Sequence, residues 1–92
     1  MERITEKHLR SRLNTINALV GANPEPWSNL PDGTHQANPG TYCLDRAYGG
    51  VKLAQIMNTS GGERDVLGVG YVSKRALYDL LGAFIAGLQA RK

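Results

Sequence analysis

The stretch TYCLDRAYGGVKLAQIM, residues 41–57, decides the fold of this chain. Its two flanks, 41–47 and 51–57, contain apolar, aromatic and β-branched residues, and they enclose a short glycine-containing turn at 48–50. Two such runs around a glycine turn predict a β-hairpin. The register stays open because neither run alternates cleanly between apolar and polar residues. Residues 52–57 also fit a turn of helix.

Helical patterns flank this hairpin on both sides. Residues 5–20 begin with the N-cap residue Thr5, carry apolar residues at spacings of three and four, and are followed by Gly21. Residues 74–90 follow the N-cap residue Ser73 and carry a wide apolar stripe. These patterns predict an α+β domain. In it, a small antiparallel sheet of two to three strands packs against an N-terminal and a C-terminal helix.

The remaining segments are shorter and less regular. Residues 22–40 hold all four prolines and an Asp-Gly turn signal, which together predict a long loop. We expect Trp27, the only tryptophan, to pin this loop, with a short strand around 34–36 as an option. Residues 63–67 are expected to add a third strand and so complete the sheet over 41–67. The 92 residues are expected to form one domain.

Composition argues against several classes of function. The formal net charge is +3, and the single cysteine, Cys43, has no partner for an internal disulfide. No run approaches the roughly 18 apolar residues of a membrane span. The charged N-terminus lacks the apolar core of a signal peptide, so we expect a cytoplasmic protein without membrane association. His8, His35 and Cys43 lack metal-ligand spacing, and no catalytic residue, metal or cofactor is predicted.

Glycines and cations suggest an anion site. The last helix begins with Ser73 and two cations, which are unfavourable at a helix N-terminus unless a negative partner meets them. Glycine turns leave backbone amides uncovered, and Arg64 follows one of them closely. Tyrosines beside glycines are candidates for stacking on a base. The predicted ligand-binding residues are Tyr48, Gly49, Gly50, Gly61, Gly62, Arg64, Tyr71, Ser73, Lys74 and Arg75.

Three short patterns carry a resemblance to a known group. They are AYGG at 47–50, a double glycine followed by Asp65, and KRALY at 74–78. The chain resembles, over nearly its whole length, a group of small accessory proteins encoded by tailed bacteriophages. The resemblance implies expression in the bacterial cytoplasm. Small phage accessory proteins often inhibit host defence, including CRISPR and nucleotide-signal systems. The leading hypothesis is a non-enzymatic protein that sequesters a phosphate-bearing ligand, for example a nucleotide immune signal.

Two alternatives stay open. The predicted order α-β-β-β-α is similar to that of double-stranded-RNA-binding domains. The last helix of those domains begins with a basic cluster, and Lys74 and Arg75 match part of it. That resemblance implies nucleic-acid binding. The second alternative is an inhibitor of a host enzyme or CRISPR complex, anchored by exposed aromatic residues such as Trp27 and Tyr78. Under all three hypotheses we expect a homo-oligomer, because a core this small gains from association.

Overall fold

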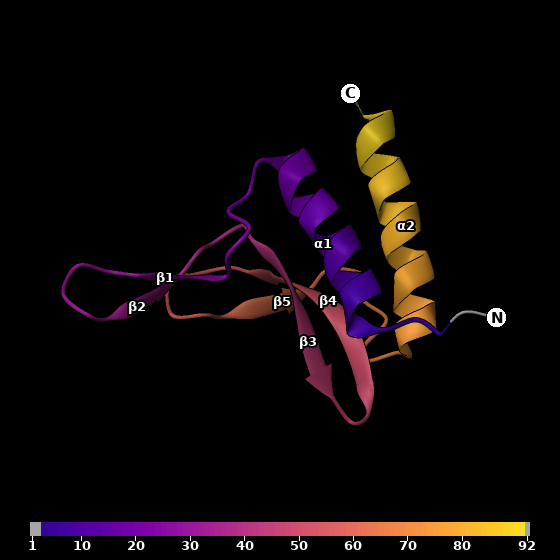
Figure 1. Ribbon diagram of the computed structural model, residues 1–92, viewed down its shortest axis with the longest axis horizontal. Coiled ribbons are helices and arrows are strands. Elements are labelled where there is room, and N and C mark those ends of the chain that lie inside the picture. Colours follow the sequence, from indigo (N-terminus) through magenta and orange to yellow (C-terminus); the bar gives the residue numbers. More distant parts are fainter. Residues whose placement is uncertain (1–2, 92) are drawn as a thin grey trace.

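Two helices lie side by side over a small antiparallel sheet (Figure 1). The computed structural model describes residues 3–91. The helices are α1, Glu6–Val20, and α2, Lys74–Ala90. α1 ends at Gly21, whose φ of 72° is the left-handed conformation expected at that position. The predicted α+β class, with a helix at each end of a small sheet, is confirmed. No helix in the described part is long and apolar enough to cross a membrane.

The predicted hairpin forms the centre of the sheet. β3, Tyr42–Ala47, pairs with β4, Gly50–Ile56, and β5, Glu63–Asp65, lies on the other side of β4. The register runs from Tyr42 opposite Gln55 to Ala47 opposite Gly50, and the helical alternative for residues 52–57 is wrong. The turn is also shorter than predicted, because Gly50 already belongs to β4. It consists of Tyr48 and Gly49, with φ values of 54° and 74°, and a type I′ turn requires this sign at both positions.

The proline-rich segment is more regular than the sequence suggested. β1, Trp27–Asn29, pairs with β2, His35–Ala37, to form a second hairpin that we call the arm, residues 27–37. Figure 1 shows the arm projecting from the sheet, away from α2. The expected short strand is present, one residue later than predicted. The arm also places two strands before the central hairpin, so the order departs from α-β-β-β-α.

The apolar core fills the space between the helices and one face of the sheet. Side chains at alternate positions of β4 point to this face, and the helices contribute their apolar stripes. The buried members are Leu9, Leu13, Ile16, Val51, Leu53, Leu77 and Leu81. A polar contact joins α1 to the edge of the sheet. The buried amide of Asn17 donates to Tyr42 O over 3.1 Å and accepts from Tyr42 N over 2.9 Å.

Trp27 connects the arm to the rest of the chain. A Cβ placed on Gly61 would lie 2.8 Å from Trp27 Cζ2, so the indole rests directly on this glycine. Gly61 also has a φ of 94°, which favours glycine independently of the contact. The indole remains 48% exposed. Trp27 therefore has the pinning contact expected of it, while one part of its surface faces solvent.

Candidate anion-binding site

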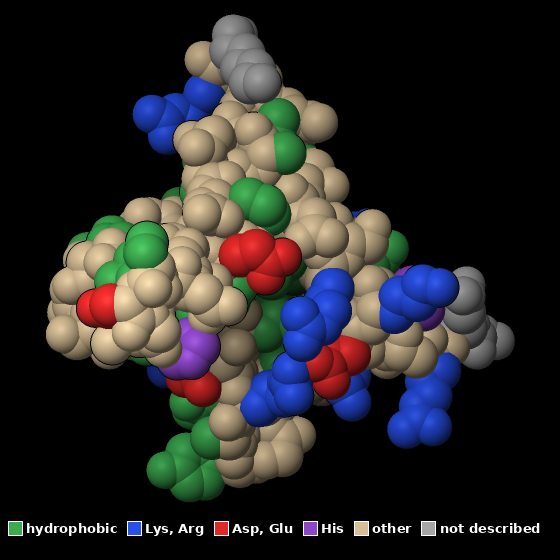
Figure 2. Space-filling view, turned by 60° about the vertical axis from the view of Figure 1, so that its left-hand side comes forward, with side chains coloured by type: hydrophobic (Ala, Val, Ile, Leu, Met, Phe, Trp, Pro, Cys, Tyr) green, Lys and Arg blue, Asp and Glu red, His purple; other side chains and the backbone are tan. Residues whose placement is uncertain are grey.

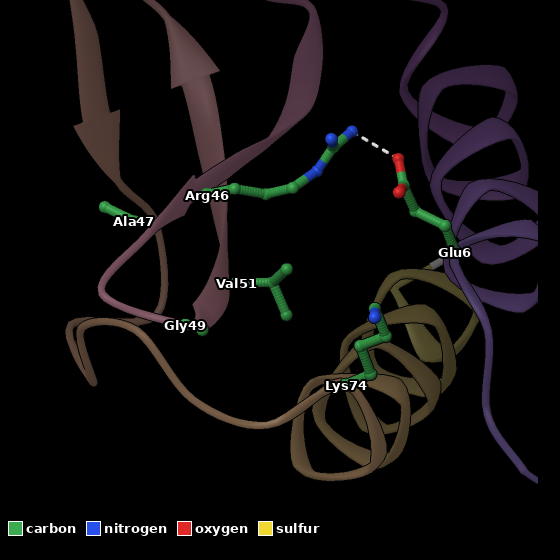
Figure 3. A pocket seen from close by; sticks show the side chains of 7 residues that line it. Glu6, Arg46, Ala47, Gly49, Val51 and Lys74 are labelled. Carbon is green, nitrogen blue, oxygen red and sulfur yellow. Dashed lines mark hydrogen bonds and ion pairs between the residues drawn. The ribbon is translucent and has the colours of Figure 1, made fainter.

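A pocket lies between the tip of the central hairpin and the first turn of α2 (Figure 3). We call it the cationic pocket, and its volume is about 340 Å³. Three of the predicted residues line it, together with four that were not predicted. The lining residues are Glu6, Arg46, Ala47, Gly49, Gly50, Val51 and Lys74.

The charges of the cationic pocket are unequal. Arg46 Nη2 donates to Glu6 Oε1, and Arg10 Nη2 reaches the same oxygen over 3.2 Å. Figure 3 shows the Lys74 side chain extending from α2 toward the place where Glu6 and Arg46 meet. Within residues 3–91, no carboxylate lies within ion-pair distance of the Lys74 amine. The lining residues therefore present two cations against one carboxylate, and Arg10 adds a third cation beside them.

Backbone contacts hold Lys74 at the pocket. Val51 N donates to Val72 O over 2.8 Å, and Val72 N donates to Val51 O over 2.9 Å, which ties the chain before α2 to β4. Ser73 then caps the helix, because its hydroxyl oxygen accepts from Ala76 N over 3.1 Å. The Ser73 hydroxyl is thus engaged by the helix itself, and Ser73 is not among the lining residues.

Gly50 permits a close approach of two chain segments. A Cβ on Gly50 would lie 3.0 Å from both Tyr71 Cβ and Val72 O. The second of these is a backbone atom that takes part in the bridge to β4. The glycine was predicted as a place where a ligand approaches the backbone. In the structure, the segment leading into α2 makes that approach, on the same stretch that borders the pocket.

Arg64, a predicted ligand-binding residue, does not join Lys74 at the cationic pocket. Arg64 lies on β5 opposite Gln55, and Arg64 Nε donates to Gln55 Oε1 over 2.9 Å. Gln55 is four positions along β4 from the pocket residue Val51. This corresponds to about 13 Å at the usual rise of a strand. Arg75 follows Lys74 on α2 but does not line the pocket.

The second double glycine likewise lies away from the pocket. Gly61 packs under Trp27, as described above. Gly62 N donates to Asn58 Oδ1 over 2.9 Å, and a Cβ on Gly62 would collide with the Asn58 side chain. These glycines therefore shape the turn between β4 and β5 near the base of the arm, and they do not border the cationic pocket.

The two predicted stacking tyrosines differ in their surroundings. The Tyr71 hydroxyl donates to Asp45 Oδ2 over 2.7 Å, and Lys52 Nζ lies 4.7 Å from the centre of the Tyr71 ring. This hydrogen bond, with partial burial and the Asp45 charge, raises the pKa of Tyr71 to about 12. The ring of Tyr48 meets Tyr71 edge-on at 5.6 Å and is 97% exposed at the tip of the hairpin. Tyr48 is therefore the tyrosine with an open face.

The structure also places Cys43 and Tyr78, two residues that the sequence analysis considered, and it can be searched for metal-binding groups. Burial, together with the neighbouring charge of Glu63, raises the pKa of the Cys43 thiol to about 12, so this thiol is protonated at neutral pH. Tyr78, named as an anchor for a protein partner, is half-buried, and Arg12 Cζ lies 3.5 Å from the centre of its ring. In the described part of the chain, no group of three or more His, Cys, Asp or Glu residues is placed to hold a metal ion.

Sequence reasoning did not select Arg46 or Glu6 for the site. The sequence did contain one sign that Arg46 faces the helices, because it shares its strand face with Tyr42 and Leu44, which pack against the core.

Comparisons with protein-family models, with curated proteins and with solved structures found no match for this chain.

Proposed function

We propose that this protein binds a small phosphate-bearing molecule in the cationic pocket and acts by sequestering it. The observation that carries the proposal is the meeting of Lys74 and Arg46, from α2 and β3, beside the backbone of Gly49 and Gly50. Lys74 has no carboxylate partner among the described residues. A phosphate would supply the missing negative charge and accept charge-assisted hydrogen bonds from both cations.

Glu6 orients the guanidinium of Arg46 in this proposal. The carboxylate accepts from Arg46 through one nitrogen, and a guanidinium has five N–H donors in a planar fork. Other donors of Arg46 therefore remain for a phosphate oxygen, and its side chain is 50% exposed. The cost is that Glu6 repels the same phosphate, so binding needs both Arg46 and Lys74 to outweigh it.

Tyr48 does not line the cationic pocket, but its position next to the lining residue Gly49 favours a nucleotide among phosphate-bearing molecules. It directly precedes Gly49 and presents an exposed ring at the hairpin tip. Aromatic side chains of this kind stack on nucleobases. A pocket of about 340 Å³ lies at the small end of the usual range for ligand sites and suits one nucleotide unit. The resemblance to phage accessory proteins sets the biological context that we propose, a non-enzymatic binder that withholds a nucleotide signal from a bacterial defence system.

Isothermal titration calorimetry with AMP, 3′,5′-cyclic AMP, cyclic di-AMP and inorganic phosphate tests this function. We expect at least one nucleotide to bind, with an affinity at least tenfold lower in Lys74→Gln. Arg64→Gln is the matched control, because it removes a cation that lies away from the pocket and should leave binding unchanged. Absence of heat with all four probes would overturn the proposal, as would equal binding by wild type and Lys74→Gln.

A further inference from the structure

The outer edge of β3 leaves backbone hydrogen-bonding groups open. Among the described residues, β3 lies at the end of its sheet and pairs only with β4. Ile56 N on β4 donates to Thr41 O over 2.9 Å, so position 41 faces β4. The N–H and C=O of one residue point to the same side of a strand, and the side alternates along the chain. Tyr42, Leu44 and Arg46 therefore direct these groups away from β4.

Asn17 shows what this edge can bind. Its side-chain amide makes two hydrogen bonds to the backbone of Tyr42, one in each direction, as an added strand would. Beyond Tyr42 the edge is open. Within residues 3–91, no hydrogen bond is made to the outward N–H and C=O groups of Leu44 and Arg46. The free stretch therefore begins one step past the position that Asn17 occupies.

A groove of about 270 Å³ runs along this open stretch, between α1 and the segment that leads into the arm. Figure 2 shows a hollow between the arm and the helices, with apolar side chains at its floor and Lys and Arg side chains along one rim. We call it the edge groove. It is lined by Arg10, Leu13, Asn14, Pro24, Glu25, Pro26, Tyr42, Cys43, Leu44 and Arg46.

The edge groove has a basic end and an apolar end. α1 runs antiparallel to β3, because Asn17 contacts Tyr42 while Glu6 contacts Arg46. Arg10 and Arg46 therefore share one end. The two prolines, Leu13 and Tyr42 lie toward the other end, where Glu25 makes a second acidic group unfavourable. A bound segment is thus expected to be acidic at one position and apolar at another.

We propose that the edge groove binds an extended peptide segment of a partner protein, which joins β3 as a further strand and carries an acidic side chain two residues from an apolar one. Residues two apart lie on the same face of a strand, so both side chains would turn toward α1. The acidic group would meet Arg10 and Arg46, two cations that share only one carboxylate, Glu6. The apolar group would meet Leu13 and the prolines. The backbone would bond to Leu44 and Arg46, as in other cases of strand addition.

Amide hydrogen exchange measured by NMR tests this proposal directly. The probes are Ac-Thr-Val-Thr-Glu-Thr-NH2 and Ac-Thr-Glu-Thr-Val-Thr-NH2, which cover both strand directions, and each has a counterpart with Lys in place of Glu. With one Glu peptide at saturation, we expect exchange of the Leu44 and Arg46 amides to slow at least tenfold. The Lys counterpart should bind at least tenfold more weakly. Protection of the Leu44 amide without any peptide would instead show pairing between copies and overturn the proposal.

A variant that fills the edge groove separates it from the cationic pocket. Asn14→Trp places a large side chain in the edge groove from an exposed position of α1, and Ser11→Trp is the matched control outside it. We expect peptide binding to be lost in Asn14→Trp and kept in Ser11→Trp, while nucleotide binding is unchanged in both. The peptide proposal is overturned if neither Glu peptide binds at millimolar concentration. It is overturned equally if Asn14→Trp binds as well as wild type.

Discussion

Arg12 on α1 joins Tyr78 on α2 through two contacts at once. Arg12 Nη1 donates to Tyr78 O over 2.8 Å, and Arg12 Cζ lies 3.5 Å from the centre of the Tyr78 ring. Gly82, one helical turn further on, leaves the space that the guanidinium occupies, since a Cβ there would overlap Arg12 Nη1. The helix pair is thus fixed by a cation that lies in a notch left by a glycine.

This arrangement predicts that the effect of Gly82→Ala depends on Arg12. Alanine in place of glycine inside a helix usually stabilises by about 1 kcal/mol. Here the new methyl group displaces the guanidinium, so we expect the gain to be cancelled in the wild-type background and recovered in Arg12→Ala. A double-mutant cycle by urea unfolding should show a coupling of about 1 kcal/mol. Equal effects of Gly82→Ala in both backgrounds would contradict the arrangement.

Asn17 is expected to be among the most sensitive positions in the chain. It is buried, and Asn17→Ala leaves an N–H and a C=O of Tyr42 without their partner. Each unsatisfied buried group costs about 1–3 kcal/mol, so a loss of about 2–4 kcal/mol in unfolding free energy is predicted. The exposed neighbour Asn14 is the control, and Asn14→Ala should change stability by less than about 0.5 kcal/mol. Similar losses for both variants would show that the amide of Asn17 has no special role.

Gly49 and Gly50 are expected to respond differently to alanine. Gly49 has a positive φ but open space around it, so Gly49→Ala should cost about 1–2 kcal/mol of stability and leave the cationic pocket formed. Gly50→Ala pushes on the backbone of Val72 and should disrupt the bridge that positions Lys74. Calorimetry at a temperature where both variants are folded should therefore show weaker nucleotide binding only in Gly50→Ala. The reverse order of affinities would contradict this role of Gly50.

The raised pKa of Tyr71 leads us to predict that the free energy of unfolding falls at high pH. Its pKa is raised from 10.0 to about 12, with the hydrogen bond to Asp45 as the main cause. A raised pKa in the folded state means that the contribution to stability is complete below pH 10 and is lost as the pH rises toward 12. Urea unfolding across this range should show a decline that Tyr71→Phe lacks. An equally steep decline in the Phe variant would assign the effect to other groups.

The sequence predicted those parts of the fold that rest on local signals. Each helix has a capping residue and apolar residues at helical spacing. The central hairpin has a glycine-containing turn directly between its two strands. The first strand of the arm was missed and the second was only an option, because strands of three residues are too short to show alternation. The Asp32-Gly33 signal does mark the turn between them. The hairpin register depended on contacts with α1, such as the one made by Asn17.

The candidate site was predicted only in part, for a related reason. Lys74 was found because a cation at the start of a helix is a local anomaly. Arg64 was grouped with it on proximity to glycines, but the pairing of β5 with β4 places it beside Gln55 instead. Arg46 and Glu6 are 40 residues apart and meet only because α1 runs antiparallel to β3. The residue pattern within α1 or within β3 alone does not predict that ion pair.

The contact between Asn17 and Tyr42 also acts as a check on how the hairpin is aligned. If β3 slipped by one residue against β4, the N–H and C=O of Tyr42 would turn toward β4, and the amide of Asn17 would be buried without a partner. A one-residue slip therefore cannot keep both the strand ladder and the contact with α1. A single side chain on α1 thus disfavours pairings of β3 and β4 that are shifted by one residue, although the hairpin lies more than 20 residues further along the chain.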